Sequence, residues 1–377
     1  MHDVAVIGAG PVGATLAALA TGAGLDIAVF EARPGPSGEE RILALSHASR
    51  EILEEARAWR AASAPIESIH ISQKGGPGRT LLEASEQSIP ALGYTVSYAA
   101  LESALADRLR EASVPVTYAA ACRDISLGPD AATIRFSSGA EVRARLLVLA
   151  DGGANAAKIP GIAFSEKDYG QHAVTGLVAT DRAHGRRAYE RFTPQGPVAL
   201  LPVEGRYALV WTASPQEAER LLALDDEQFL RGLQAHFGDR AGRFTSIARR
   251  AAFPLKLRTV NVPVALRTAI VGNAAQALHP IAGQGLNLGL RDAASLASVI
   301  ASTPRERLGD HAMLDGYREM RRRDAARGVA FTDFLVSAFA DGRRIPTWGR
   351  GLALAALDLF PPARRALASR MIHGAER

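Results

Sequence analysis

The sequence predicts an α/β protein with a Rossmann-like nucleotide-binding domain, an inserted antiparallel-sheet domain and a C-terminal helical tail. Three observations predict this fold class. A glycine-rich turn at residues 8–13 lies between an apolar strand and a helix. Residues 172–214 contain β-rich runs separated by turn residues. From about residue 287 onward, apolar residues recur at helical spacing.

The composition is that of an ordinary globular protein. The chain has 377 residues, of which 47% are hydrophobic and 22% charged, enough for a sizeable core and two or three structural units. The single cysteine, Cys122, excludes a disulfide framework and multi-cysteine metal sites, so we expect no metal centre. The net charge is +5, but the basic residues do not alternate with aromatic ones, so no nucleic-acid partner is expected.

The start of the chain and its hydropathy bear on its location. The first strand begins within the first three residues, so we expect no signal peptide. No apolar run reaches the roughly 18 residues of a membrane-spanning helix. The expected location is therefore the cytoplasm.

The first βαβ unit covers residues 3–34. Residues 3–7 are a short apolar strand, residues 11–24 a helix that ends at a glycine, and residues 26–34 the next strand. Two more apolar strands follow far along the chain, so the nucleotide domain is predicted to be discontinuous. Its predicted parts are 1–70, 97–165 and 262–330, the β-rich substrate domain takes 71–96 and 166–261, and the C-terminal helices take 331–377.

The first glycine turn has the spacing of a dinucleotide fingerprint. It consists of Gly8, Ala9 and Gly10, then Pro11, Val12 and Gly13. The first glycine permits a tight turn, the second lets a pyrophosphate approach the backbone, and the third lets helix and strand pack closely. The N–H groups of the following helix then face the phosphates.

An acidic residue ends the second strand of this unit. Glu31, followed by Ala32, is placed to accept hydrogen bonds from ribose hydroxyls. The turn and the acid together predict a bound dinucleotide, but they do not decide between NAD and FAD.

Two further strands also end in glycine turns. Asp151 and Gly152 follow the apolar strand at residues 145–150, although this pair is also common in plain β-turns. Gly272 and Asn273 open the stretch "GNAAQALHPIAGQGLNLGLRD", which by itself indicates only an anion site. Three such turns in this order, around an inserted sheet, resemble the flavin-dependent aromatic hydroxylases of the p-hydroxybenzoate hydroxylase type.

Longer stretches sharpen this resemblance. Residues 65–84, 168–174, 189–203 and 272–292 resemble the FAD-dependent hydroxylases of ubiquinone biosynthesis, particularly the 2-octaprenyl-6-methoxyphenol hydroxylase branch. The resemblance extends from residue 1 to about residue 370. It implies FAD as the cofactor and a p-hydroxybenzoate hydroxylase-like fold.

The resemblance also implies the roles of the later residues. FAD is a long molecule, so the late loop would bind its isoalloxazine end while the first loop binds its pyrophosphate. The Asp151–Gly152 turn would bind the cofactor, the Gly272–Asn273 turn would contact its ribityl chain, and Arg41 would lie over it. Gly283 and Gly285 would let the backbone approach the ring, with the backbone of Leu286 and Asn287 facing flavin N1 and O2. Pro280 would border the ring, and His279 would either move a phenol proton or only shape the loop.

The function implied by the resemblance is hydroxylation of the aromatic ring of a polyprenylated phenol in ubiquinone biosynthesis. NAD(P)H would donate the electrons and O2 would be the co-substrate, through a flavin C4a-hydroperoxide. Two alternatives stay open at this point. One is a hydroxylase of a soluble aromatic or polyketide substrate, and the other is a low-turnover flavin-binding subunit of a biosynthetic complex.

The tail offers a contact with the membrane that holds such a substrate. Residues 341–377 combine apolar residues at helical spacing with arginines that could meet anionic headgroups. We expect either peripheral binding at the inner face of the membrane or helices that only cap the flavin domain. A ubiquinone-biosynthesis complex is a further expected partner.

Overall fold

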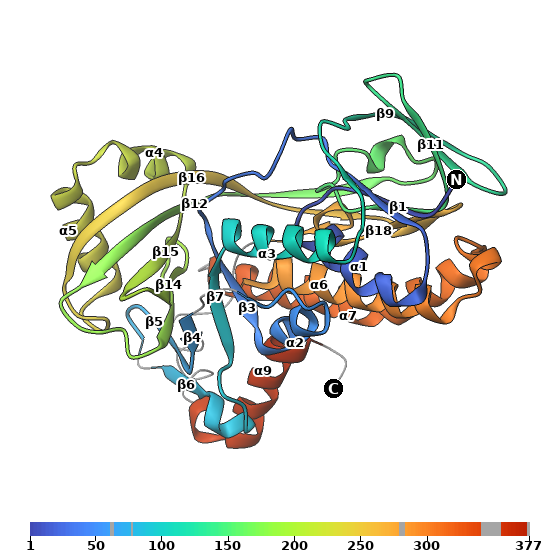
Figure 1. The fold of residues 1–377 in the computed structure, drawn as a ribbon. Helices are drawn as coiled ribbons and strands as arrows, with labels where there is room; N and C mark the ends of the chain where they lie inside the picture. The colour runs from blue at the N-terminus through green and yellow to red at the C-terminus, as the bar shows by residue number, and fades with distance from the viewer. Residues whose placement is uncertain (61–63, 77, 279–282, 341–355, 375–377) are drawn as a thin grey trace.

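The computed structural model describes residues 1–60, 64–76, 78–278, 283–340 and 356–374. Two large sheets form the molecule, and two long antiparallel strands, β12 (Phe164–Thr180) and β16 (Phe244–Val260), run from one sheet region to the other (Figure 1). The predicted fold class, an α/β nucleotide domain with an inserted sheet domain and C-terminal helices, is confirmed.

The nucleotide domain is built on a sheet with a parallel centre. The central strands pair in parallel as β18-β11-β1-β2-β8, and their near-continuous apolar runs reflect burial on both faces. The strands of this sheet, in order, are β17 (Val264–Ala265), β18 (Thr268–Ile270), β11 (Glu141–Leu149), β1 (His2–Ile7), β2 (Ile27–Phe30) and β8 (Val116–Thr117), with β10 (Ala132–Phe136) and β9 (Cys122–Leu127) following β11 on a branch.

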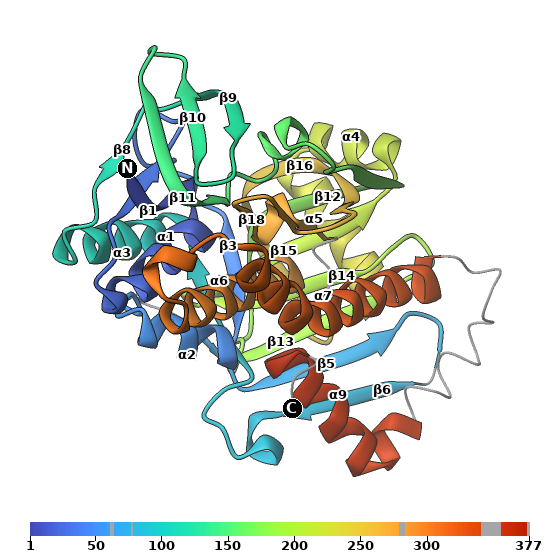
Figure 2. The ribbon, with the colours of Figure 1, turned by 90° about the vertical axis from the view of Figure 1, so that its right-hand side faces the viewer.

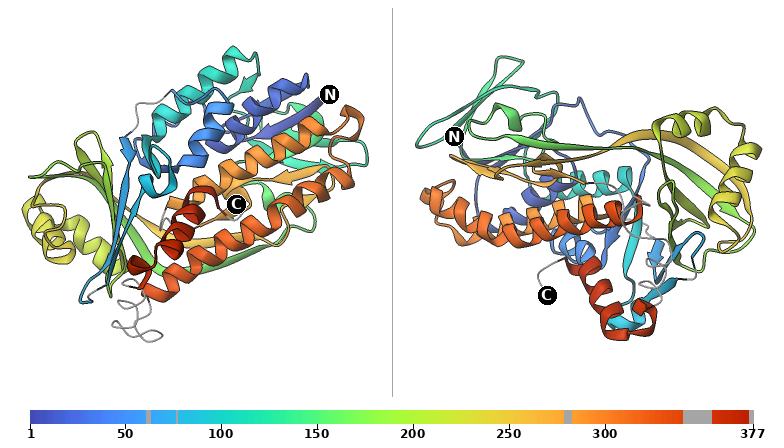
Figure 3. Two further views of the ribbon diagram at one scale, coloured as in Figure 1. Left: turned by 90° about the horizontal axis from the view of Figure 1, so that it is seen from below. Right: turned by 180° about the vertical axis from the view of Figure 1, so that it is seen from behind.

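Helices cover one face of this sheet. They are α1 (Pro11–Ala20), α3 (Tyr98–Glu111), α6 (Gln284–Ser302) and α7 (His311–Ala340). The two later helices run side by side (Figure 3). α1 and α6 cross at Gly289, where an added Cβ would lie 2.8 Å from Val12 Cγ2, so this close crossing requires glycine. Their apolar faces and the sheet enclose the largest core of the molecule, which includes Leu16, Leu105 and Leu290.

The inserted domain is a mostly antiparallel sheet. Helices α4 (Pro215–Ala223) and α5 (Asp226–Phe237) cover its outer face, and the side chains of Ser214 and Asp225 cap their N-termini. The strands of this sheet, in order, are β19 (Gln276–Ala277), β16, β12, β15 (Arg206–Ala213), β14 (Val198–Val203), β13 (Arg187–Phe192), β5 (Ser68–Gln73) and β6 (Arg79–Glu83).

The course of residues 64–97 differs from the predicted domain limits. The expected limit at residue 71 falls inside β5, which pairs along its whole length with β13. After β6, strand β7 (Gly93–Ser97) leaves the large sheet and pairs with β3 (Ile42–Ser46) and β4 (Ala64–Ile66) in a separate small sheet, beside helix α2 (His47–Glu55). These pairings join distant residues and leave no local mark in the sequence.

The last described helix, α9 (Pro361–His373), packs across β6 and the short helix η2 (Ala84–Gln87) (Figure 2). Ala368 and Ile372 are buried there, and Arg364 forms an ion pair with Glu86. This part of the tail is therefore integral to the fold, whereas Arg343, Arg344 and Arg350 lie outside the described residues. No helix within the described ranges has the length and apolar character needed to cross a bilayer.

Candidate functional site

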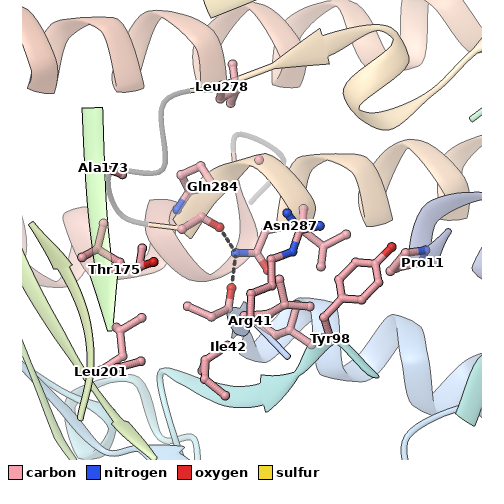
Figure 4. Close-up of a pocket in the computed structure, with 18 of the residues that line it drawn as sticks. Pro11, Arg41, Ile42, Tyr98, Ala173, Thr175, Leu201, Leu278, Gln284 and Asn287 are labelled. Atoms are coloured by element: carbon pink, nitrogen blue, oxygen red, sulfur yellow. Dashed lines mark hydrogen bonds between the residues drawn. The ribbon is translucent and has the colours of Figure 1, made fainter. Parts of the chain in front are cut away.

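A large cavity lies between the two sheets. Its volume is about 1360 Å³, larger than the roughly 300–1,000 Å³ of a pocket for one small ligand. Figure 4 shows Ala173 and Thr175 of β12 and Leu201 of β14 across the cavity from Asn287 in the first turn of α6. The cavity therefore has room for a long cofactor and for a second molecule beside it.

Most of the residues predicted to bind the cofactor line this one cavity. Gly13 and Gly272 do not line it and act through packing instead. The predicted residues in its wall are Gly8, Gly10, Pro11, Val12, Glu31, Ala32, Arg41, Asp151, Gly152, Asn273, Gly283, Gly285, Leu286 and Asn287.

The three positions of the first loop that carry glycine do so for different structural reasons. Gly8 has φ +105°, and an added Cβ would lie 2.6 Å from the carbonyl oxygen of Ala150. At Gly13 an added Cβ would lie 2.1 Å from the carbonyl oxygen of Gly8. At Gly10, in contrast, the nearest described atom is the Tyr98 hydroxyl at 3.7 Å. Packing thus explains the first and third glycines, while the second leaves an open space at the cavity.

Glu31 organises the first loop as well as facing the cavity. Its carboxylate accepts hydrogen bonds from the backbone N–H of Ala9 at 2.9 Å and from the backbone and side chain of Arg33 at 3.0 Å. Burial raises the pKa of Glu31, but these hydrogen bonds outweigh it and hold the pKa below its ordinary value. Glu31 therefore stays ionised beside the glycine turn, where it can also accept hydrogen bonds from a ribose.

Arg41 lies at the mouth of the cavity. Its guanidinium stacks 4.5 Å from the ring centroid of Tyr98, and its Nε lies 3.2 Å from a carboxylate oxygen of Glu39. Figure 4 shows Arg41 and Tyr98 side by side near Pro11, which begins helix α1. The arrangement places a cation and an aromatic ring over the first glycine loop.

The turn after β11 is held by its own side chains. Asp151 accepts hydrogen bonds from the backbone N–H groups of Gly153 and Asn155, both at 2.9 Å, and from the Asn155 side chain at 2.6 Å. Gly152 has φ +72°, with no described atom within 4 Å of an added Cβ. Asp151 therefore shapes the turn, and its two oxygens are already in use.

A buried ion network supports the late loop. Asp292 Oδ2 accepts a hydrogen bond from the backbone N–H of Gly272 at 3.0 Å, and its Oδ1 accepts one from Arg321 Nε at 2.8 Å. Arg321 also contacts Asp324, which pairs with Arg291. All four charged side chains are buried. This network connects the late loop to α6 and α7, and the sequence analysis did not predict it.

The first turn of α6 also faces the cavity. Gly283 precedes it with φ +62°, and an added Cβ on Gly285 would find, among the described residues, only Asn273 Oδ1, at 4.0 Å. The Asn287 side chain is fully used, because it accepts from the backbone N–H of Ser46 at 2.9 Å and donates to the carbonyls of Ala44 and Gly283 (Figure 4). The Asn287 side chain is thus engaged within the protein, and the backbone of this turn remains able to meet a ligand.

The site fits FAD. Gly10 and Gly285 both lack a Cβ where protein packing does not require it, and both face the cavity. The N-termini of α1 and α6 begin at this cavity and favour negative charge, such as a pyrophosphate at one end and the anionic edge of a reduced flavin at the other. When bound, FAD would supply the redox chemistry and the activation of oxygen.

Two predicted catalytic residues lie outside the described residues. They are His279 and Pro280, within the undescribed segment 279–282. Within the described ranges, no group of three or more His, Cys, Asp or Glu side chains could hold a metal ion. Glu190 of β13 and several residues of α9 also line the cavity, and none of them was predicted from the sequence. The alternation of side chains along β13 could have predicted that Glu190 faces the cavity. The residues of α9 reach the cavity only through the tertiary fold.

Known proteins match this chain along most of its length. The family described as "FAD binding domain" matches residues 1–332. Ubiquinone hydroxylase UbiL of Rhodospirillum rubrum is 34% identical over 96% of this chain and 87% of its own, and the 3-demethoxyubiquinol 3-hydroxylase of Escherichia coli is 30% identical over 94% of each.

Solved structures show the same fold. The p-nitrophenol 4-monooxygenase PnpA of Pseudomonas putida superposes with a TM-score of 0.79, at 18% identity, over 100% of this chain and 99% of its own. HpxO of Klebsiella pneumoniae, complexed with FAD and uric acid, superposes with a TM-score of 0.78, at 18% identity, over 99% and 97%. Together with the sequence matches and the geometry of the cavity, they lead to one conclusion: this chain belongs to the FAD-dependent hydroxylases of ubiquinone biosynthesis, a family of flavin-dependent aromatic monooxygenases.

Proposed function

We propose that this protein hydroxylates the aromatic ring of a polyprenylated phenol in ubiquinone biosynthesis, with electrons from NAD(P)H and oxygen from O2. FAD in the cavity would supply the activated oxygen. The protein would hold the phenol ring beside the flavin and keep bulk water away from it.

The observation that carries this proposal is the apolar end of the cavity. There the side chains of α9 meet those of β5 and β6 in one hydrophobic cluster that also lines the cavity. The cluster residues in the cavity wall are Ile69, Ile71, Leu82, Leu92, Phe192, Leu367, Ala368, Met371 and Ile372. A small soluble aromatic acid would gain little from this wall, whereas each isoprene unit buried there would gain hydrophobic free energy.

We further propose that the protein collects this substrate at the inner face of the membrane. Leu359 and Phe360, just before α9, are 83% and 60% exposed. Arg365 and Arg370, on α9 itself, are exposed as well. Apolar and cationic side chains close together suit a contact with an anionic bilayer surface, next to the apolar end of the cavity. Assembly with other ubiquinone-biosynthesis proteins stays a prediction.

The test compares two substrates on the purified holoenzyme. We expect NADPH oxidation coupled to hydroxylation with 2-geranylphenol, and a much higher KM with 2-methylphenol, which lacks the chain. Ile69→Glu should raise the KM for 2-geranylphenol about tenfold or more and leave that for 2-methylphenol nearly unchanged, because it places a charge in the apolar wall.

Two other results would contradict the proposal. Equal KM values for both phenols would favour the hydroxylase of a soluble aromatic substrate. Bound FAD with no substrate-stimulated NADPH oxidation would favour the low-turnover flavin-binding subunit. Profiling of quinone intermediates by mass spectrometry in cells that lack the protein would then identify the affected step.

A further inference from the structure

One carboxylate faces the cavity from the middle of the inserted sheet. Along β13, Ala188, Glu190 and Phe192 place their side chains on the cavity face, because successive residues of a strand alternate between faces. The intervening Tyr189 packs on the other face, with its ring 5.7 Å from that of Phe237. Glu190 therefore points into the same cavity as the first turn of α6.

The neighbours of Glu190 are apolar. Its partners across the sheet are Ile71 on β5 and Ala199 on β14. Among the described residues, none forms a hydrogen bond or an ion pair with the Glu190 carboxylate. Glu190 is only half-buried and lines the cavity, so its carboxylate can meet a molecule bound there.

The charged and titratable side chains of the adjoining strands lie on the opposite face. Arg187 and Arg191 alternate with Glu190 along β13, and their side chains bond to Ser68 and Ser72 of β5. His70 pairs with Tyr189 in the register and lies against its ring. β14 carries no charged residue. With no cation facing it in the described part of the chain, burial alone raises the pKa of Glu190 to about 7.

Glu190 also stands between the two ends of the cavity. On one side, β14 provides Leu201, which Figure 4 shows facing Ile42 and the α6 turn. On the other side, β5 provides Ile71, which belongs to the apolar cluster with α9. A prenylated phenol with its chain in that cluster and its ring toward the flavin site would bring its hydroxyl group close to this position.

We propose, building on the function proposed above, that Glu190 is a catalytic residue that accepts the proton of the substrate's ring hydroxyl. The phenol O–H bond breaks and a carboxyl O–H bond forms, while the electron pair stays on the phenolate oxygen and makes the ring more nucleophilic toward the activated oxygen. When the ring regains its aromaticity, the C–H bond of the hydroxylated carbon breaks and its proton goes to the oxygen left on the oxygen donor, while the Glu190 carboxyl returns its proton to the ring oxygen, so the carboxylate is restored. A phenol has a pKa of about 10, so a carboxylate made more basic by burial is a better acceptor than one in water.

The test uses the FAD-loaded full chain with 2-geranylphenol. Glu190→Gln preserves shape, and Glu219→Gln, on exposed α4 of the same domain, is the matched control. We expect the wild type and the control to show a kcat that rises with pH through about 7. Glu190→Gln should lose this rise and roughly 10²- to 10⁴-fold of kcat, with FAD content unchanged.

Two readouts separate catalysis from a structural role. The ultraviolet band of bound phenolate in the oxidised holoenzyme should appear at lower pH in the wild type than in Glu190→Gln. The stability of the wild type relative to Glu190→Gln should fall as the pH rises from 4.5 through 7, because the carboxyl with the raised pKa is present only in the wild type.

Each outcome has a definite meaning. If Glu190→Gln keeps the wild-type kcat, pH profile and phenolate band, Glu190 is not the proton acceptor. If the wild type ignores 2-geranylphenol but hydroxylates a soluble phenol in a Glu190-dependent way, the proposed substrate is wrong while the role of Glu190 stands.

Discussion

The carboxylate of Asp292 accepts a hydrogen bond from the backbone N–H of Gly272 at 3.0 Å while its other oxygen accepts one from Arg321 at 2.8 Å. The late glycine loop is thereby attached to α6 and α7 through a buried charge pair. Burial raises the pKa of Asp292, although Arg321 and the hydrogen bonds from Gly272 and Gln276 oppose this effect. The loop at the cavity thus depends on residues that do not touch the cavity.

Asp292→Ala should destabilise the protein by about 3–5 kcal/mol, because it leaves Arg321 buried with one fewer counter-charge. It should also release FAD by freeing the late loop. Urea unfolding and flavin content measure the two effects. The control is Glu319→Ala, which removes an exposed pair with Arg322 on α7 and should change neither quantity. Full FAD retention by Asp292→Ala would show that the loop does not need this anchor.

The glycines of the first loop should respond differently to alanine. Gly10→Ala should leave the stability of the FAD-free protein unchanged, because the added Cβ would point into open cavity space and contact no described protein atom closely. The same Cβ should weaken FAD binding at least tenfold, because it would occupy space that the pyrophosphate needs. Gly13→Ala should destabilise even the FAD-free protein, because its Cβ would overlap the Gly8 carbonyl. Thermal unfolding with and without FAD distinguishes them, with surface Gly22→Ala as the control. Normal FAD affinity in Gly10→Ala would place the pyrophosphate elsewhere.

Glu31→Ala should weaken FAD binding by roughly 10- to 100-fold, since a hydrogen bond to a charged group contributes about 1.5–3 kcal/mol. The loss has two sources, the ribose contact and the anchor of the Ala9 N–H. Glu31→Gln keeps one acceptor oxygen and should fall between alanine and the wild type. Quenching of flavin fluorescence on titration gives the dissociation constants. Equal affinities for all three proteins would remove Glu31 from the site.

His236 should make the protein sensitive to acid. Burial, together with Lys74 and Arg191, lowers its pKa to about 4, and its ring lies 4.8 Å from that of Trp211. The unfolded chain therefore binds the extra proton first, and the contribution of His236 to stability should fall as the pH drops from 6.5 to 4, by on the order of 1–3 kcal/mol. His236→Gln should flatten this slope when the unfolding temperature is measured across that range. An unchanged slope would assign the effect to other groups, such as His70.

Membrane contact predicts salt-sensitive co-sedimentation with anionic vesicles. The double variant Leu359→Ser and Phe360→Ser should reduce binding at least fivefold while it retains FAD. The control is Leu266→Ser, which removes a 52% exposed leucine from the turn between β17 and β18. An equal loss of vesicle binding in the double variant and in the control would indicate nonspecific hydrophobic adsorption. No loss of binding in either variant would exclude this contact.

The sequence was sufficient to locate the parts of the candidate site that depend on local backbone geometry. The first glycine loop lies between β1 and α1, as its spacing predicted, and Glu31 immediately follows β2. The turn at Asp151 and the start of α6 were located in the same way. At each of these positions a short stretch of chain contains both the strand end and the residue that matters.

The sequence was insufficient to predict strand pairings and side-chain contacts between residues that are far apart in the chain. Ser68 pairs with Arg187, so β5 joins the inserted sheet ahead of the predicted limit at residue 71, which no pattern within 64–84 could show. Asn287 was expected to act through its backbone, yet its side chain bonds to Ser46, 241 residues away along the chain. The apolar neighbours of Glu190 come together only when β5, β13 and β14 are assembled.

The discontinuous nucleotide sheet has a consequence for how the chain reaches its native state. β1 pairs with β11 at His2 and Ala144, and β11 pairs with β18 at Leu147 and Thr268. Contacts between such distant residues raise the contact order and slow folding, because each loop must close before its pairing stabilises anything. Refolding should therefore pass through states in which the local hairpins of the inserted sheet, β5–β6 and β13–β14–β15, are formed before the central parallel strands join. Binding of FAD would come late, as the step that locks the joined strands together.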